Sequence, residues 1–114
     1  MNKPEFSMPY GDGNHPDEYN DLTSKEKEVL NEWIREVLEP CRIKSFSRSI
    51  PTSYGLKHRF QYSDVGFYVT NGQFKGAMLV AGFEPAYHDD LNWRFRLSKN
   101  AGDKKNPSRR SRWK

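Results

Sequence analysis

Basic side chains are the residues of this sequence whose types and spacing most clearly predict a chemistry. Arg94 and Arg96 alternate with apolar residues, and seven basic residues and one acid follow between residues 99 and 114. Guanidinium and ammonium groups bind polyphosphate backbones by releasing condensed counterions. Trp113 lies among the last cations, where an aromatic ring can stack on an unpaired base. The cations beside it that we expect to contact nucleic acid are Lys104, Lys105, Arg109, Arg110, Arg112 and Lys114.

Two short clusters combine a histidine with two acids: His15, Asp17 and Glu18, and His88, Asp89 and Asp90. The first lies in a segment without helical or strand period, and the second lies in a predicted turn, so neither has a supporting layer that would fix a reactive geometry. The single cysteine, Cys41, cannot form an internal disulfide and does not indicate a zinc site. We therefore predict a protein that is not an enzyme and has no metal and no cofactor.

The charge is unevenly distributed along the chain. Residues 1–40 hold four Lys/Arg and ten Asp/Glu, a net charge of −6, whereas residues 41–114 hold fifteen and five, a net charge of +10. The basic part favours a polyanionic partner. Neither a signal peptide nor a membrane-spanning stretch is visible, so we predict a cytoplasmic protein without a membrane partner.

Helical spacing and capping signals predict the elements that position these cations. Apolar residues recur at helical spacing from Val29 to Leu38, after a possible capping box of Thr23 and Glu26, and Pro40 ends this helix. A short helix of about two turns is predicted over residues 54–60, after the caps at residues 52 and 53. A third helix is predicted over residues 71–81, with a capping box of Thr70 and Gln73, a staple of residues 69 and 74 and a stop at Gly82.

The remaining part of the folded region has the pattern of two strands. Residues 83–87 and 91–97 are extended segments separated by a turn, which favours a β-hairpin. In the second segment Leu91, Trp93, Phe95 and Leu97 alternate with polar and cationic residues, so one face is apolar. We predict an α+β fold, winged-helix-like, with three helices followed by a β-hairpin wing. Its parts are a disordered acidic arm (1–21), the folded domain (22–98) and a disordered basic tail (99–114).

This order of elements, over Thr23 to Ser98, resembles a winged helix-turn-helix domain. The stretches TSYGLKHRF, YVTNGQFKGAMLVAGF and NWRFRLS are also similar to small proteins and accessory winged-helix segments of bacterial phages and other mobile elements. That resemblance implies a role in replication, gene control or counter-defence of such an element. In winged-helix proteins the helix after the turn enters the major groove and the wing contacts the backbone or the minor groove.

The resemblance implies contacts from the folded region to nucleic acid. On the third helix Asn71, Gln73 and Lys75 would face the bases, with Gly72 and Gly76 permitting close approach. Asn71 and Gln73 have an alternative role in the helix cap. The remaining contacts would be made by Lys57, Arg59, Arg94 and Arg96.

Three functions are compatible with the sequence. The first is an accessory or regulatory protein that binds nucleic acid, with duplex DNA favoured and RNA possible. The second is an inhibitor that binds a host or phage protein, such as an anti-CRISPR-like factor, for which the tyrosines at 54, 62, 68 and 87 would suit an interface. The third is a ribonucleoprotein component.

Overall fold

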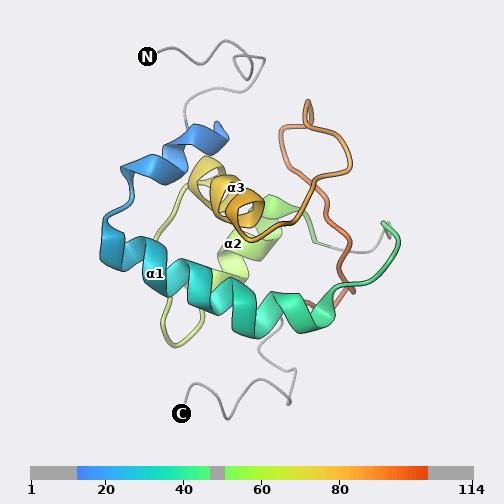
Figure 1. Ribbon diagram of the computed structural model, residues 1–114, viewed down its shortest axis with the longest axis horizontal. Helices are drawn as coiled ribbons and strands as arrows, with labels where there is room; N and C mark the ends of the chain where they lie inside the picture. Colours follow the sequence, from blue (N-terminus) through green and yellow to red (C-terminus); the bar gives the residue numbers. More distant parts are fainter. Residues whose placement is uncertain (1–12, 47–50, 103–114) are drawn as a thin grey trace.

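The computed structural model describes residues 13–46 and 51–102 (Figure 1). Their elements, in chain order, are the 3₁₀ helix η2 (Pro16–Asp21), the α-helix α1 (Ser24–Trp33), the π turn η3 (Ile34–Leu38), the 3₁₀ turn η4 (Glu39–Cys41), α2 (Ser53–Gln61) and α3 (Asn71–Val80). Figure 1 shows α3 near the centre, with η2 on one side and α1 crossing below it.

The predicted first helix is confirmed. The backbone N–H of Glu26 donates to Thr23 Oγ1 at 3.1 Å and that of Thr23 donates to Glu26 Oε1 at 2.8 Å, which completes the capping box. The helix does not stop at α1, because the chain continues through η3 and η4 to Cys41. Pro40 lies within η4, where the helical region ends.

Both predicted boundaries of α3 are confirmed. Thr70 and Gln73 form the second capping box. At the other end Gly82 has a φ of +90°, its N–H donates to Leu79 O, and the N–H of Phe83 donates to Met78 O at 2.9 Å. These two bonds satisfy carbonyls of the last turn, and glycine reaches this φ without a steric penalty from a Cβ.

Helices α1, α2 and α3 meet at aromatic side chains. Trp33 of α1 contacts Phe60 of α2 and Phe74 of α3 in edge-to-face geometry, with ring centroids 5.3 and 6.5 Å apart. All three side chains are almost completely buried. Edge-to-face contacts between aromatic rings stabilise a core beyond the area they bury, so this triad is the centre of the fold.

Residues 16–21 differ from the predicted arm, because they form η2 and lie against α3. The N–H of Gly72 donates to Gly13 O at 2.9 Å, and Thr70 Oγ1 donates to Glu18 Oε1 at 2.9 Å. A Cβ on Gly72 would collide with the backbone of His15, and one on Gly76 with Pro16 O. The two glycines therefore permit the close approach of η2 to α3. Residues 1–12 of the predicted arm lie outside the described residues.

The predicted β-hairpin wing is wrong, and with it the winged-helix-like α+β fold. The described residues contain no strand, only an isolated bridge between Arg42 and Leu97. Ala86 N–H donates to Arg94 O, but the pairing does not extend, because Arg96 O accepts from the N–H of Ile43 instead. The backbone of Trp93 pairs elsewhere, since its N–H donates to Ser53 Oγ and its carbonyl accepts from the N–H of Ser53.

Residues 99–102 also differ from the predicted tail. Ala101 is fully buried. Gly102 packs against the core, since a Cβ added to it would lie 3.3 Å from Cη2 of Trp33. Residues 103–114 lie outside the described residues. Within the part of the chain that the structure describes, no helix combines the length and apolar character needed to cross a membrane.

Candidate nucleic-acid interface

Two of the three predicted recognition residues of α3, Asn71 and Lys75, lie inside the molecule. Asn71 is 5% exposed; its amide donates to Asn14 Oδ1, Leu91 O and Asn92 Oδ1, and its Oδ1 accepts from Ser53 Oγ. Gln73 serves the cap, because its Oε1 accepts from the N–H of Thr70. Both residues therefore have structural roles, and the buried Asn71 does not present its amide to a base.

Lys75 is completely buried under η2. Its ammonium donates to Asn14 O at 3.0 Å and lies 4.9 Å from the centroid of the Trp93 ring. Burial lowers the pKa of Lys75 to about 8, while the charges of Glu18 and Asp90 act in the opposite direction. The structure thus assigns Lys75 to the attachment of residues 13–21, and no phosphate can reach it here.

The two candidates on α2 are engaged as well. Lys57 is 4% exposed and donates to Gln61 Oε1 at 2.8 Å. Arg59 donates to Lys99 O and Ala101 O at 3.3 and 2.6 Å, so it attaches the segment that precedes residue 103. The sequence predicted that both cations would be available to nucleic acid, but in the structure neither projects freely into solvent.

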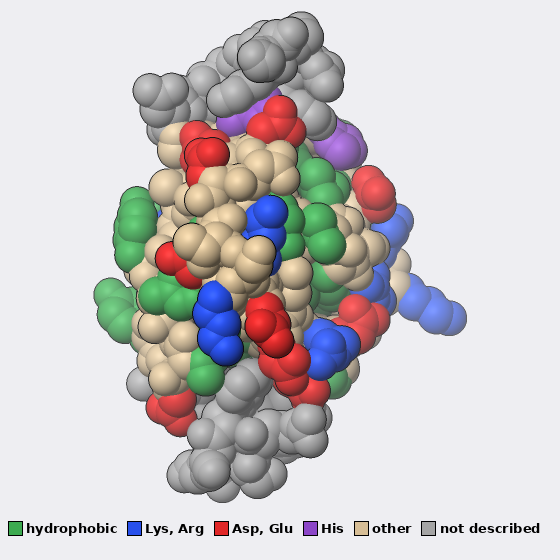
Figure 2. All heavy atoms as spheres, turned by 60° about the vertical axis from the view of Figure 1, so that its left-hand side comes forward, with side chains coloured by type: hydrophobic (Ala, Val, Ile, Leu, Met, Phe, Trp, Pro, Cys, Tyr) green, Lys and Arg blue, Asp and Glu red, His purple; other side chains and the backbone are tan. Residues whose placement is uncertain are grey.

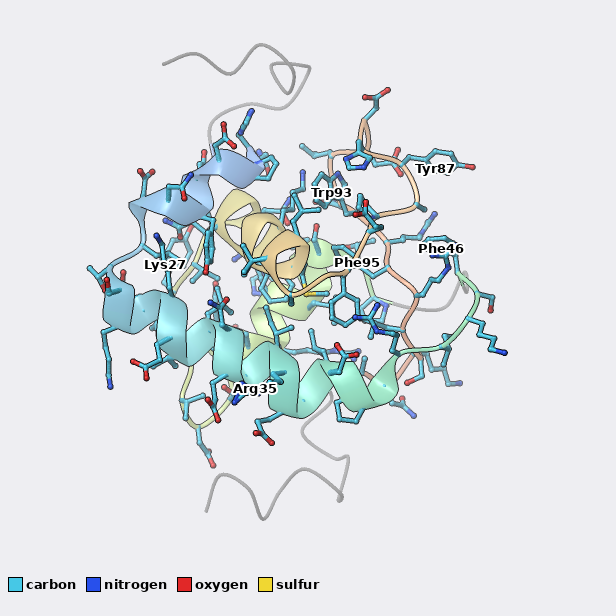
Figure 3. All side chains as sticks on the ribbon, in the orientation of Figure 1. Lys27, Arg35, Phe46, Tyr87, Trp93 and Phe95 are labelled. Atoms are coloured by element: carbon cyan, nitrogen blue, oxygen red, sulfur yellow. The ribbon has the colours of Figure 1, made fainter. Side chains whose placement is uncertain are left out.

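Arg94 and Arg96 are exposed, as expected from the alternation in residues 93–97. Trp93, Phe95 and Leu97 have no exposed surface. These three alternate residues point inward and anchor the segment in the core. Figure 3 shows Trp93 and Phe95 pointing into the interior. The predicted apolar face is therefore confirmed at these three positions. It fails at Leu91, which is 49% exposed, because the chain turns before Trp93 instead of continuing as a strand.

An aromatic side chain accompanies Arg96. Its guanidinium carbon lies 4.5 Å from the centroid of the Phe46 ring, and the N–H of Ile43 donates to Arg96 O at 3.0 Å. Phe46 and Tyr87 both lie toward the right-hand edge of Figure 3. We call the surface formed by Arg94, Arg96, Phe46 and Tyr87 the arginine edge.

The arginines of this edge differ from the other exposed arginines in their ion pairs. Arg35 pairs with Glu32 at 2.9 Å, and Arg42 pairs with Glu39 at 2.9 Å. Within residues 13–46 and 51–102 no carboxylate pairs with Arg94 or Arg96. Their charges are consequently available to an anionic partner.

The opposite part of the surface carries both signs of charge. In the view of Figure 2, which brings the left-hand side of Figure 1 forward, acidic and basic side chains are interspersed over one face. Such a surface has no strong field of one sign. We therefore place the candidate interface at the arginine edge and not on this face.

Both histidine clusters have structural explanations. His15 is buried and its Nδ1 accepts from the N–H of Asp17 at 3.0 Å, which caps η2. The imidazole of His88 lies 3.7 Å from Glu84, and the carbonyl of His88 accepts from Trp93 Nε1. No group of three or more metal-ligating side chains of the His, Cys, Asp and Glu types occurs among the residues with described positions.

Sequence reasoning missed Phe46, because residues 42–50 have no regular period and Phe46 meets Arg96 only through the fold. It also missed the row of rings that Tyr54 and His58 of α2 form with Tyr62, the residue after this helix, although their spacing of four residues indicates one helix face. The predicted tail contacts, Lys104, Lys105, Arg109, Arg110, Arg112, Trp113 and Lys114, lie outside the described residues.

Comparison of the chain with protein-family models, with curated proteins and with solved structures finds no match.

Proposed function

We propose that the protein binds nucleic acid as an accessory factor without catalytic activity, and that the arginine edge provides the contacts of the folded region. The observation that carries the proposal is the exposure of Arg94 and Arg96 on a segment fixed by Trp93, Phe95 and Leu97, without carboxylate partners among the described residues. Because the buried neighbours fix the backbone of this segment, only the arginine side chains have to be ordered when they bind a phosphate, and their planar fork matches phosphate geometry.

The net charge supports the same partner. Residues 41–114 carry a net charge of +10, and six of their fifteen Lys/Arg follow Gly102, at one end of the chain. The preference for duplex DNA depended on α3 as a reading helix, and burial of Asn71 and Lys75 removes that argument.

The test is a fluorescence-anisotropy titration of the full chain against single-stranded DNA, random duplex DNA and structured RNA. The variant Arg94→Gln/Arg96→Gln removes two exposed charges from the edge. The control Lys25→Gln/Arg35→Gln removes two charges from exposed positions on α1 and η3, so its net charge is the same. We expect the edge variant to bind on the order of tenfold more weakly at low salt and the control to bind within about twofold of the native chain. Equal binding by all three proteins would overturn the assignment of the edge.

A second candidate function is the binding of a protein partner. It is favoured by the exposure of four tyrosines, at 51% for Tyr54, 71% for Tyr62, 70% for Tyr68 and 67% for Tyr87. Tyrosine is enriched in the energetically important parts of protein interfaces. A tagged chain that retains one protein after nuclease treatment, and releases it when Tyr62 and Tyr87 are changed to serine, would favour this function over the first.

A further inference from the structure

A cleft of about 340 Å³ opens where the residues before and at the start of α3 meet α2. It does not involve the arginine edge. Its lining combines amide, hydroxyl, aromatic and cationic groups, which are contributed by Gly13, Asn14, Tyr54, Lys57, His58, Gln61, Tyr68, Thr70 and Asn71.

Lys57 supplies the charge of this cleft. Its side chain is nearly buried, and the described residues give its ammonium one hydrogen-bond acceptor, Gln61 Oε1 at 2.8 Å. An ammonium has three N–H donors. No carboxylate of the described residues forms an ion pair with Lys57, and burial lowers its pKa. A positive charge that is partly desolvated and has no anionic neighbour favours a ligand that brings an acceptor or a negative charge.

Two tyrosine rings flank this ammonium. Lys57 Nζ lies 5.4 Å from the centroid of the Tyr54 ring and 5.0 Å from that of Tyr68. Both rings also keep much of their surface in solvent, at 51% and 70% exposure. Tyr54 is supported from one side by the imidazole of His58, with centroids 4.5 Å apart. Exposed aromatic faces beside a cation are suited to a planar ring that carries polar substituents.

Most other polar groups of the cleft are already bonded. The Asn71 amide has three acceptors, and Thr70 Oγ1 both donates to Glu18 and accepts from the N–H of Gln73. Among the described residues, the groups left to meet a ligand are the two tyrosines, His58, the ammonium of Lys57 and the amide nitrogen of Gln61, whose Oε1 already accepts two hydrogen bonds. This set combines stacking with one or two hydrogen bonds to an acceptor.

We propose that this cleft binds one unpaired nucleotide, with its base against Tyr54 or Tyr68 and a base carbonyl or phosphate oxygen accepting from Lys57. The inference rests on the proposed nucleic-acid binding and narrows the ligand of the protein to single-stranded nucleic acid. A base in a duplex is stacked and paired, so its faces are not available to an aromatic side chain.

The experiment uses the full chain and a fluorescein-labelled thymidine 12-mer, titrated by anisotropy. Tyr54→Ala and Tyr68→Ala each remove one wall of the cleft and should weaken binding about tenfold. Tyr62→Ala is the matched control, because Tyr62 directly follows α2, is 71% exposed and does not line the cleft. It should bind within about twofold of the native chain. Lys57→Met preserves volume and removes the charge, and melting curves of all variants verify that they are folded.

A second probe separates stacking from backbone contact. A 12-mer of abasic residues keeps the phosphates and lacks the bases, so the native chain should bind it more weakly than the thymidine 12-mer. The difference between the two strands should be much smaller for the Tyr54→Ala/Tyr68→Ala variant, which keeps only the expected stacking on Trp113. Competition by thymidine monophosphate identifies the source of the nucleotide. Displacement of the labelled strand at millimolar concentration means that a free nucleotide suffices, and no displacement means that the cleft requires a strand.

The failures of the two proposals are distinguishable. If both tyrosine variants bind the thymidine 12-mer as tightly as the native chain while Arg94→Gln/Arg96→Gln binds weakly, the cleft inference is wrong and the proposed function stands. If the native chain binds no nucleic acid at low salt, both are wrong.

Discussion

Helix α3 and the extended segment 93–97 are both anchored in the core, but they leave different side chains to solvent. Helix α3 packs on the core through Phe74 and Met78 and is covered on another side by η2, so even Lys75 is buried. Segment 93–97 is buried on one face only, and Arg94 and Arg96 stay exposed. A cation on a doubly covered element becomes part of the structure, whereas a cation on a singly covered element can meet a partner.

Removing a buried side chain from segment 93–97 should have the largest effect. Phe95→Ala deletes a fully buried ring that contacts both Phe83 and Trp93, and we expect the free energy of unfolding to fall by about 3–5 kcal/mol. Leu91→Ala, at a half-exposed position of the same region, should change it by less than about 1 kcal/mol. Urea denaturation measures both. Equal losses would mean that the segment continues as the alternating strand that the sequence predicted.

The buried lysine of α3 should make stability depend on pH. The pKa of Lys75 is about 8 in the folded protein and about 10.4 in an unfolded chain, so between these values the unfolded state binds more protons. The free energy of unfolding should therefore rise as pH increases from about 8 to 10.4, by roughly 3 kcal/mol from this group. Lys75→Met should lose that rise. Denaturation series at pH 7.5 and 10 compare the two proteins, and the same rise in the variant would contradict the burial of Lys75.

The contact between η2 and α3 gives the third prediction. Gly72→Ala places a methyl group against the backbone of His15, and we expect a loss of about 1–3 kcal/mol even though alanine favours helices more than glycine does. In Gly55→Ala the new methyl group meets only Pro51 Cβ at 3.3 Å, so this control in α2 should be close to neutral. A stable Gly72→Ala protein would show that η2 does not lie on α3.

The helices were predictable because their signals are local. Capping boxes, the glycine stop and the helical spacing each depend on residues within one or two turns, and the structure has all of them. The wing was not predictable from alternation alone. Alternation predicts which side chains are buried, and it was right for Trp93, Phe95 and Leu97, but whether the backbone pairs into strands depends on distant partners. Here Ser53 takes both backbone groups of Trp93.

Contacts between residues distant in the sequence also decided which candidate site residues are exposed. No local signal shows that η2 covers α3, so Asn71 and Lys75 had the pattern of exposed contacts while they are buried. Arg94 and Arg96 were identified because their exposure follows from the alternation of their neighbours. The cleft between α2 and the start of α3 joins residues 13–14, 54–61 and 68–71, and their proximity arises only from the tertiary fold.

The most direct test of the arginine edge is the salt dependence of binding by the full chain. Anisotropy titrations of a single-stranded 12-mer between about 50 and 200 mM salt give the slope of log K against log salt concentration for the native chain and for Arg94→Gln/Arg96→Gln. If both arginines contact phosphates, the slope of the variant should be smaller by about 1.4, and Lys25→Gln/Arg35→Gln should retain the native slope. Identical slopes for all three proteins would show that the arginine edge does not contact the nucleic-acid backbone, which would contradict the proposed function of this edge.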